Sequence, residues 1–509
     1  MFVKVTSVLK IIAVSAMFVM LLVSANAVYA EELSYGESQA SVLFSYFPDA
    51  HNDIATLSSE SAIDALENGM RNFDEKIDVS SFGYTTSNLD VFENDYSIAV
   101  NTNYDLYYVT SHFRYSYYSS GNIAFIYPTY STTDTEEIEE TVKLMDIEIE
   151  KILSYADESM TDAQKLLAVH DRIVLQTQYD DTLQKYSAKD LLLDGTAVCQ
   201  GYAAALHCVA EKLGITGGLV RSKQMNHMWN VFLIDGKWYH VDATWNDPAS
   251  YRYTGILHKY FLKSDEWMTT SGGHYGFNSG SAVSTEFDDF FWHGLKSPVI
   301  TVSGQMFFID NSGKYGALSV YNSYTGKTDQ LYQFKKLWMA GTNSYWQDSF
   351  SGLAYYDGRL YFNNQDAVMS CKLDGTDVKT EYTISDTSSS SVYGCFELDG
   401  QICYEVSLKS ATNGKYEKYF MDITPDEKDS FYSARIFENN GKKYFSYVNE
   451  QENPCNVFVF SKNGGRLSEV KVIPINTKRG TVELEIDADS FEIMAVTGDG
   501  VPLMGKIEK

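Results

Sequence analysis

Apolar residues recur at helical intervals over several stretches of the first half of the chain. The clearest stripe lies between residues 134 and 155, where the apolar positions are Ile138, Val142, Met145, Ile149 and Ile152. A spacing of three or four residues places such side chains on one face of a helix. A second stripe predicts a helix through Ile63, Leu66, Met70 and Phe73.

End signals predict three further helices. Thr161 followed by Gln164 has the pattern of a capping box, which predicts a helix from there to about Gln176. A short helix is expected near 188–193. The next helix is expected to run from about Cys199 to Leu213, with Gly214 placed to end it.

Alternating and β-branched patterns predict strands in two regions. Residues 90–130 are rich in tyrosine, and the alternation from Tyr104 to Val109 is typical of strands. The tyrosines from Tyr104 to Tyr118 could bind a glycan or a peptide, but a sheet with core and surface positions is the interpretation that we favour. From about Pro298 onward the whole pattern changes to that of β structure.

A short glycine signature recurs in this second region. The glycine is followed by alternating apolar residues, as at Gly304, Gly358, Gly400 and Gly441. Each signature is followed by another turn signal, near Gly326, Gly375, Gly414 and Gly464. Two turns per unit predict repeated four-stranded units, which are typical of propeller blades. The sequence therefore predicts an all-β C-terminal domain that is either propeller-like or an irregular sandwich.

The first thirty residues have the organisation of a secretory signal. Lys4 and Lys10 precede an apolar run over residues 11–23, and small residues at Ala27 and Ala30 suit signal peptidase. We interpret residues 1–30 as a cleaved signal peptide; an uncleaved anchor is the alternative. No later segment reaches 18 apolar residues, so no transmembrane segment is expected after cleavage. The expected location is extracellular, with the protein secreted or held at the cell surface.

Length and charge narrow the organisation and the classes of partner. A chain of 509 residues is long enough for about three domains. We assign 31–150 to a tyrosine-rich α/β support region, 151–295 to a catalytic domain and 296–509 to a β-repeat domain that could be a binding module. Asp and Glu number 68 against 40 Lys and Arg, a net charge of −28. This balance argues against a nucleic-acid partner and against docking on anionic lipid.

Cysteines are few for an exported chain. The six are Cys199, Cys208, Cys371, Cys395, Cys403 and Cys455, and the last four could form up to two bridges. No CxxC pair exists, and a set of Cys199, His207, Cys208 and His227 lacks the spacing of zinc ligands. We therefore predict no metal and no cofactor.

Cys199 stands at the predicted start of a helix, where free N–H groups and the helix dipole favour the thiolate. The thiolate is the nucleophilic form of cysteine. Cys208 lies in the middle of the same helix and fits a buried core position. Cys199 is therefore the candidate nucleophile.

A predicted hairpin supplies the partners of this thiol. Asp235-Gly236 between apolar runs predicts a two-residue turn, which pairs Ile234 with Lys237. In that register His227 and Asp242 are diagonal neighbours on one face of the hairpin, close enough for a carboxylate to accept from an imidazole N–H. A cysteine, a histidine and an orienting carboxylate are the parts of a nucleophile system. His240 lies on the same face and is a rival base.

Three sequence blocks resemble the transglutaminase-like superfamily. They are Thr196-Ala197-Val198-Cys199-Gln200-Gly201-Tyr202-Ala203, Asn226-His227-Met228-Trp229-Asn230, and the run from Gly236 to Trp245. The resemblance covers about residues 155–275, and the segments that flank the three blocks resemble those of secreted bacterial members of the superfamily. It implies an α+β, papain-like fold with Cys199, His227 and Asp242 as the catalytic triad. Met228 departs from the usual small residue after the histidine.

The resemblance also implies supporting roles for Asn230, Trp245 and Tyr202. The backbone N–H of Cys199 is expected to serve as one oxyanion donor, by analogy; candidates for the second are Gln176, Gln178 and Tyr202. His274, in Gly273-His274-Tyr275, is either a C-terminal feature similar to that of the family or a loop histidine, and we favour the loop histidine.

The implied function is a secreted cysteine enzyme that acts on protein or peptide amides through a thioester. Capture of the thioester by an amine gives cross-linking, and capture by water gives deamidation or peptide hydrolysis. The alternative is a non-catalytic cell-wall or matrix-binding protein that uses the fold as a scaffold. The expected partners are a protein or peptide substrate and a cell-wall or surface protein.

Overall fold

The computed structural model describes residues 33–39, 60–248, 255–278, 280–312, 315–339, 344–345, 350–386, 390–398, 400–408, 416–421, 430–450, 453–504 and 506–509. The predicted signal segment, residues 1–30, and the turn expected near Gly414 lie outside the described residues. Two compact units are present, one made by residues before about 131 and the other by residues 98–108 and 132 onward. No helix in the described ranges carries an apolar stretch long enough to span a membrane.

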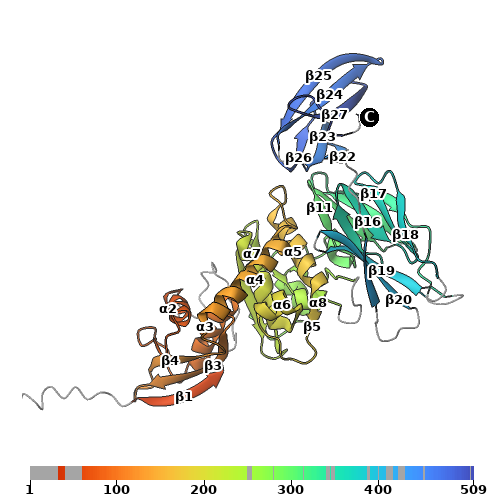
Figure 1. Ribbon diagram of the computed structural model, residues 1–509. Coiled ribbons are helices and arrows are strands. Elements are labelled where there is room, and N and C mark those ends of the chain that lie inside the picture. Colours follow the sequence, from red (N-terminus) through yellow and green to blue (C-terminus); the bar gives the residue numbers. More distant parts are fainter. Residues whose placement is uncertain are drawn as a thin grey trace, which may run out of the picture. The chain divides into compact units, whose positions relative to one another are not determined.

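The first unit is a four-stranded antiparallel sheet with helices (Figure 1). Its strands follow the order β1-β3-β4-β2, with bounds Ser34–Gln39, Val109–Tyr117, Ile123–Tyr130 and Ile77–Asp78. The helix predicted around Ile63 is confirmed as α2 (Glu60–Arg71). Helix α3 (Leu89–Asn101) turns Phe92 and Tyr96 toward Phe113 of β3, with ring centroids 5.0 and 4.9 Å from it.

The strand prediction is wrong for residues 90–106. Most of this stretch is α3, and the alternating Tyr104–Leu106 run is a 3-10 turn (η1). The fully buried residues Phe92, Tyr96 and Ala99 have helical spacing, so the burial pattern that decides the element has a period of 3.6 and not 2. Within residues 90–130, strand structure begins only at Val109.

The second unit opens with a helical layer, and the predicted helix positions are confirmed. These are α4 (Thr135–Leu153), α5 (Asp162–Gln176), α6 (Ala188–Asp194) and α7 (Cys199–Lys212). Thr161 makes the predicted capping box with Gln164. One apolar core joins Met145 and Ile149 of α4 to Leu166 of α5 and Leu206 of α7. The predicted domain division at residue 150 therefore falls inside a helix that packs with the later ones.

An antiparallel sheet packs against α7 and follows the order β10-β9-β8-β7. The strands are β7 (Gly217–Ser222), β8 (His227–Ile234), β9 (Lys237–Val241) and β10 (Phe261–Lys263), with short helices α8 (Ala243–Asn246) and α9 (Asp265–Thr270) after β9 and β10. The predicted hairpin is confirmed, because Ile234 pairs with Lys237 across Asp235 and Gly236. Both turn residues have positive φ, +50° and +74°, as this tight turn requires.

The remainder of the second unit is β-rich. Its first two sheets are meanders of β11 (Ile300–Val302), β12 (Gln305–Asp310), β13 (Ala317–Asn322) and β14 (Lys327–Gln333), then β15 (Leu353–Tyr356), β16 (Arg359–Asn363), β17 (Ala367–Lys372) and β18 (Lys379–Thr383). A third contains β19 (Ser390–Leu398), β20 (Gln401–Leu408) and β21 (Tyr416–Met421). The fourth sheet contains β22 (Phe431–Asn439), β23 (Lys442–Asn449) and β26 (Arg479–Glu483). The fifth contains β25 (Arg466–Ile475), β24 (Cys455–Asn463), β27 (Ser490–Thr497) and β28 (Ile507–Glu508).

The recurring glycine signature marks the first hairpin of each of four sheets. Gly304, Gly358, Gly400 and Gly441 all have φ between +71° and +77° in the turn between paired strands. The four-stranded repeat holds for the first two sheets. It fails at the fourth, because β23 pairs with β26 while β24 and β25 belong to another sheet. The propeller-like arrangement stays a prediction.

Candidate active site

Cys199 is the first residue of α7, as predicted. The short parallel pair β5 (Gln178–Tyr179) and β6 (Thr196–Ala197) leads the chain into this helix. Close packing requires Gly201 in the first turn, since a Cβ there would lie 2.9 Å from the backbone oxygen of Ser187. Cys199 is partly exposed, whereas the other five cysteines are buried, and all six are free thiols.

His227 begins β8 and lies beside Asp242, which directly follows β9. The His227 Nε2 to Asp242 Oδ2 distance is 2.6 Å, within hydrogen-bond range. Cys199 lies close enough to His227 to raise the pKa of its imidazole. The structure therefore brings together the three residues that the sequence proposed as a triad.

The backbone N–H and both carboxylate oxygens of Asp242 make hydrogen bonds. Its backbone N–H donates to the Tyr260 carbonyl, and its Oδ1 accepts from the Trp245 N–H as the N-cap of α8. Its Oδ2 accepts from His227 and, at 2.9 Å, from His274 Nε2. A fully buried carboxylate with this many donors is fixed in orientation and stays ionised.

The electrostatics of the pair follow from burial and attraction. Burial alone would lower the pKa of His227, but the charge and hydrogen bond of Asp242, together with Cys199, raise it to about 10. Burial alone would raise the pKa of Asp242, but attraction to His227 and hydrogen bonds from both imidazoles hold it well below its usual range. His227 is therefore protonated at neutral pH, beside an ionised Asp242.

Comparison with known families identifies the segment that carries these residues. Residues 153–243 match the family model of the transglutaminase-like superfamily. The chain carries a transglutaminase-like core. The match contains Cys199, His227 and Asp242.

Solved structures match parts of this chain. One titled a TGase matches at 13% identity over 27% of this chain and 45% of its own, with a TM-score of 0.20. A proposed cysteine protease from Cytophaga hutchinsonii matches at 18% identity over 26% and 60%, with a TM-score of 0.17. The extracellular domain of a proposed one-component system, BT4673 from B. thetaiotaomicron, matches at 9% identity over 57% and 49%, with a TM-score of 0.19. In each case this chain spans less than two thirds of the other. A search of curated proteins finds no match.

His274 contacts the candidate triad, and the sequence analysis did not predict this contact. It was expected in a loop, but it is fully buried against Asp242. Its ring lies 4.2 Å from the Trp245 ring and 4.7 Å from the Trp229 ring, measured between centroids. The two adjacent glycines and an aromatic residue were the only local signals, and neither of them indicates contact with a residue 32 positions earlier.

The rival base His240 is occupied elsewhere in the core. Its Nδ1 accepts from Trp229 Nε1 at 3.0 Å, and its Nε2 lies 2.9 Å from Asp265 Oδ1. Burial lowers the pKa of His240, against the attraction of Asp265. With both ring nitrogens bonded and the ring buried, His240 has no lone pair to offer Cys199.

The three expected supporting residues lie around the triad. Asn230 Nδ2 donates to the Ala203 carbonyl at 2.9 Å and so ties β8 to α7. Trp245 packs its ring 5.5 Å from that of His227. Tyr202 donates its hydroxyl to Asp247 Oδ2 at 2.5 Å, which commits this group away from an oxyanion. Gln176 and Gln178 stay candidates for the second oxyanion donor.

Two buried clusters have donor atoms of the kind that bind metals: His227, Asp242 and His274, and His170, Asp171 and His258. The N–O separations in both clusters, 2.6 to 3.2 Å, are those of hydrogen bonds. Cys199, His207 and Cys208 belong to no such cluster among the described residues. Burial lowers the pKa of His207 to about 4 and raises that of Cys208 to about 12, as expected for core positions.

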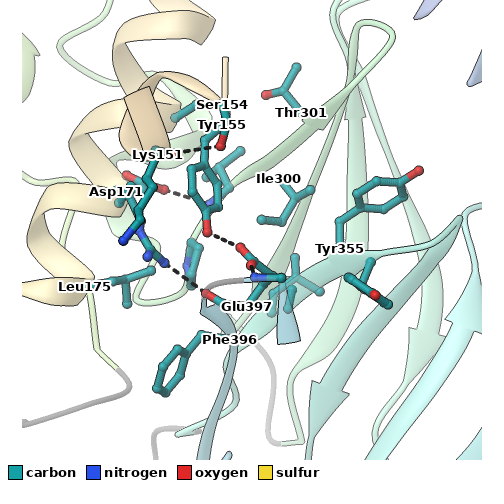
Figure 2. Close-up of a pocket in the computed structure, with 18 of the residues that line it drawn as sticks. Lys151, Ser154, Tyr155, Asp171, Leu175, Ile300, Thr301, Tyr355, Phe396 and Glu397 are labelled. Atoms are coloured by element: carbon teal, nitrogen blue, oxygen red, sulfur yellow. Dashed lines mark hydrogen bonds between the residues drawn. The ribbon is translucent and has the colours of Figure 1, made fainter. Parts of the chain in front are cut away.

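A cavity of about 580 Å³ lies between α4 and α5 on one side and strands of the β-rich region on the other (Figure 2). Tyr155 lies between these walls and donates its hydroxyl to the Glu397 carboxylate, while Arg172 Nη1 donates to the Glu397 carbonyl at 3.0 Å. Neither Cys199 nor His227 lines this cavity. The cavity therefore does not contain the candidate triad.

One wall of the cavity connects to the triad through hydrogen bonds. Asp171 Oδ1 lies 2.9 Å from His170 Nδ1, and Asn246 Nδ2 donates to His170 Nε2 at 3.0 Å. The Asn246 N–H in turn donates to the Asp242 carbonyl at 3.1 Å. Hydrogen bonds thus connect the buried cluster of His170, Asp171 and His258 to Asp242.

Proposed function

We propose that this protein is a secreted cysteine enzyme that acts on protein or peptide amides through a thioester on Cys199. The observation that supports this proposal is the partly exposed thiol at a helix start, beside a histidine that a buried carboxylate orients. The other five cysteines are buried, so Cys199 is the one cysteine with a partly exposed side chain.

The proposed chemistry assigns one role to each residue. The Cys199 sulfur attacks the amide carbonyl carbon, and a sulfur–carbon bond forms. The carbon–nitrogen bond then breaks, and His227 gives its proton to the leaving amine or ammonia. Water or a second amine attacks the thioester, His227 takes its proton, and the carbon–sulfur bond breaks to release the Cys199 thiolate. Asp242 keeps the imidazole oriented and stabilises its charged form.

His274 has the role of a positioning residue in this proposal. It contacts neither the thiol nor the imidazole of His227 by a hydrogen bond among the described residues, but it shares the carboxylate oxygen that His227 uses. A second donor on Asp242 prevents rotation of the carboxylate away from His227.

The proposed location is extracellular, which the N-terminal signal pattern supports. The β-rich region after residue 296 is proposed as a binding module, in either a propeller-like or an irregular arrangement. The alternative, a wall- or matrix-binding scaffold, does not require a reactive thiol.

A substrate panel tests the enzyme against the scaffold. The protein is incubated with a glutamine peptide and a labelled amine, and mass spectrometry separates amine incorporation, deamidation and backbone cleavage. The proposal expects at least one of these products with the wild type and none with Cys199→Ala. Absence of all three on peptides and glycopeptides, together with a thiol that resists alkylation, would favour the scaffold.

A further inference from the structure

Arg221 is a cation close to the candidate nucleophile. It lies on β7 and pairs with Met228, next to the pair formed by Ser222 and His227. Leu219 and Met228 on this face pack against Ala203 of α7. Arg221 therefore belongs to the face of the sheet that covers the helix of Cys199.

The register places the Arg221 side chain toward the start of that helix. From Leu219 to Arg221 the strand advances by two residues, about 7 Å, toward the His227 end of the sheet. From Ala203 back to Cys199 the helix runs about one turn, about 5–6 Å. Asn230, the strand partner of Leu219, donates a hydrogen bond to Ala203, so Leu219 and Ala203 lie at the same level of the sheet and the helix. The two steps run in the same direction and bring the guanidinium near the thiol.

The charge of Arg221 agrees with this placement and is not neutralised by a carboxylate. Burial lowers the pKa of Arg221, and Cys199 is the one group that opposes this effect. Within the part of the chain that the structure describes, no hydrogen bond or ion pair engages the guanidinium, and the residue is partly exposed.

We infer that Arg221 binds a carboxylate of the substrate next to the amide that Cys199 attacks. This inference rests on the proposed function and specifies its substrate class. A guanidinium presents parallel N–H donors that match the two oxygens of a carboxylate. The net charge of −28 repels acidic substrates at long range, and salt screens this repulsion beyond about 8 Å, so a local cation is what selects them.

The carboxylate can belong to either side of the scissile amide, and the experiment separates the two. One arm compares N-acetyl-γ-glutamyl-p-nitroanilide with a free α-carboxylate against its α-carboxamide. The other compares N-acetylalanyl-alanine against N-acetylalanyl-alaninamide. Wild type, Arg221→Gln, Arg221→Lys and the control Arg466→Gln, an exposed arginine on β25, are measured on all four.

The inference expects the wild type to favour the carboxylate form in one arm by about 10- to 100-fold in kcat/KM. Arg221→Gln abolishes this preference, Arg221→Lys retains part of it, and Arg466→Gln leaves it intact. A wild type that does not discriminate in either arm overturns the inference. Equal losses on both members of a pair in Arg221→Gln also overturn it, because they indicate a role in activating the thiol alone.

A binding measurement keeps this test separate from the proposed function. Calorimetry with Cys199→Ala, with and without Arg221→Gln, compares the affinity for the carboxylate and carboxamide forms of the same four compounds. A preference that depends on Arg221 supports the inference even if no compound is turned over. If the wild type turns over none of the compounds, that result contradicts the proposed enzymatic function and not the carboxylate-binding site. Equal affinities for both forms in Cys199→Ala refute the carboxylate site.

Discussion

Asp242 Oδ2 accepts hydrogen bonds from two histidines, His227 at 2.6 Å and His274 at 2.9 Å. One carboxylate oxygen thus joins the imidazole beside the thiol to a second imidazole packed between two tryptophans. The oxygen is buried, so neither donor can be replaced by solvent without a cavity. The orientation of His227 therefore depends on a residue 47 positions later in the chain.

Replacing His274 with leucine removes one of these donors. We expect kcat/KM to fall about 10- to 100-fold, the usual effect of losing a partner that orients a catalytic ligand or base. His274→Gln can place an amide N–H near the position of Nε2 and should recover part of the loss. A merely structural role predicts equal stability losses in both variants and no such recovery. The control is His112→Ala, an exposed histidine in the first unit.

The pH profile reports on the charge of His227. A pKa raised from 6.5 to about 10 means that the protonated form stabilises the folded state fully below pH 6.5, and that this contribution is lost as pH rises toward 10. We expect kcat/KM to decline at that alkaline end, because the leaving amine needs the proton. Asp242→Asn removes the largest source of attraction, so the decline should move to lower pH. An unchanged alkaline limb in Asp242→Asn would contradict this account of His227.

Much of this arrangement is visible in the sequence, and the parts that are not have a physical reason. The helix start at Cys199 and the hairpin register between Ile234 and Lys237 are set by local turn and capping chemistry. The position of His274 is set by tertiary packing across a loop, which periodicity does not report. The strand prediction for residues 90–106 was wrong because tyrosine suits both strands and half-buried helices. The packing of Phe92 and Tyr96 against Phe113, which the sequence does not show, favours the helix.

The thiols should differ sharply in reactivity. In the folded protein iodoacetamide should modify Cys199 and leave the other five, because they are buried and burial raises the pKa of Cys208 and Cys371 to about 12. Mass spectrometry of digested protein gives the extent of alkylation at each site. His227→Ala should slow the reaction at Cys199. Faster modification of any buried cysteine would show that the described core is wrong at that point.

Asp171 should matter for stability and not for the chemical step. Asp171→Asn replaces a buried carboxylate that faces His170, His258 and the Val299 N–H, and it should cost about 3 kcal/mol of unfolding free energy. Urea denaturation measures the loss, with Asp487→Asn, an exposed position, as the control. A change of less than about 0.5 kcal/mol would show that the ionic cluster does not stabilise the core.

The central claim is that Cys199 forms a thioester with an amide substrate, and the acyl-enzyme can be observed directly. The protein is mixed with the γ-glutamyl anilide and quenched in acid within the first turnovers, and the intact mass and the digested peptides are measured. The account predicts a mass increase equal to the acyl group, located on Cys199, removed by hydroxylamine and absent in Cys199→Ala. Product formation without any acyl adduct, or an adduct on another residue that persists in Cys199→Ala, would contradict it.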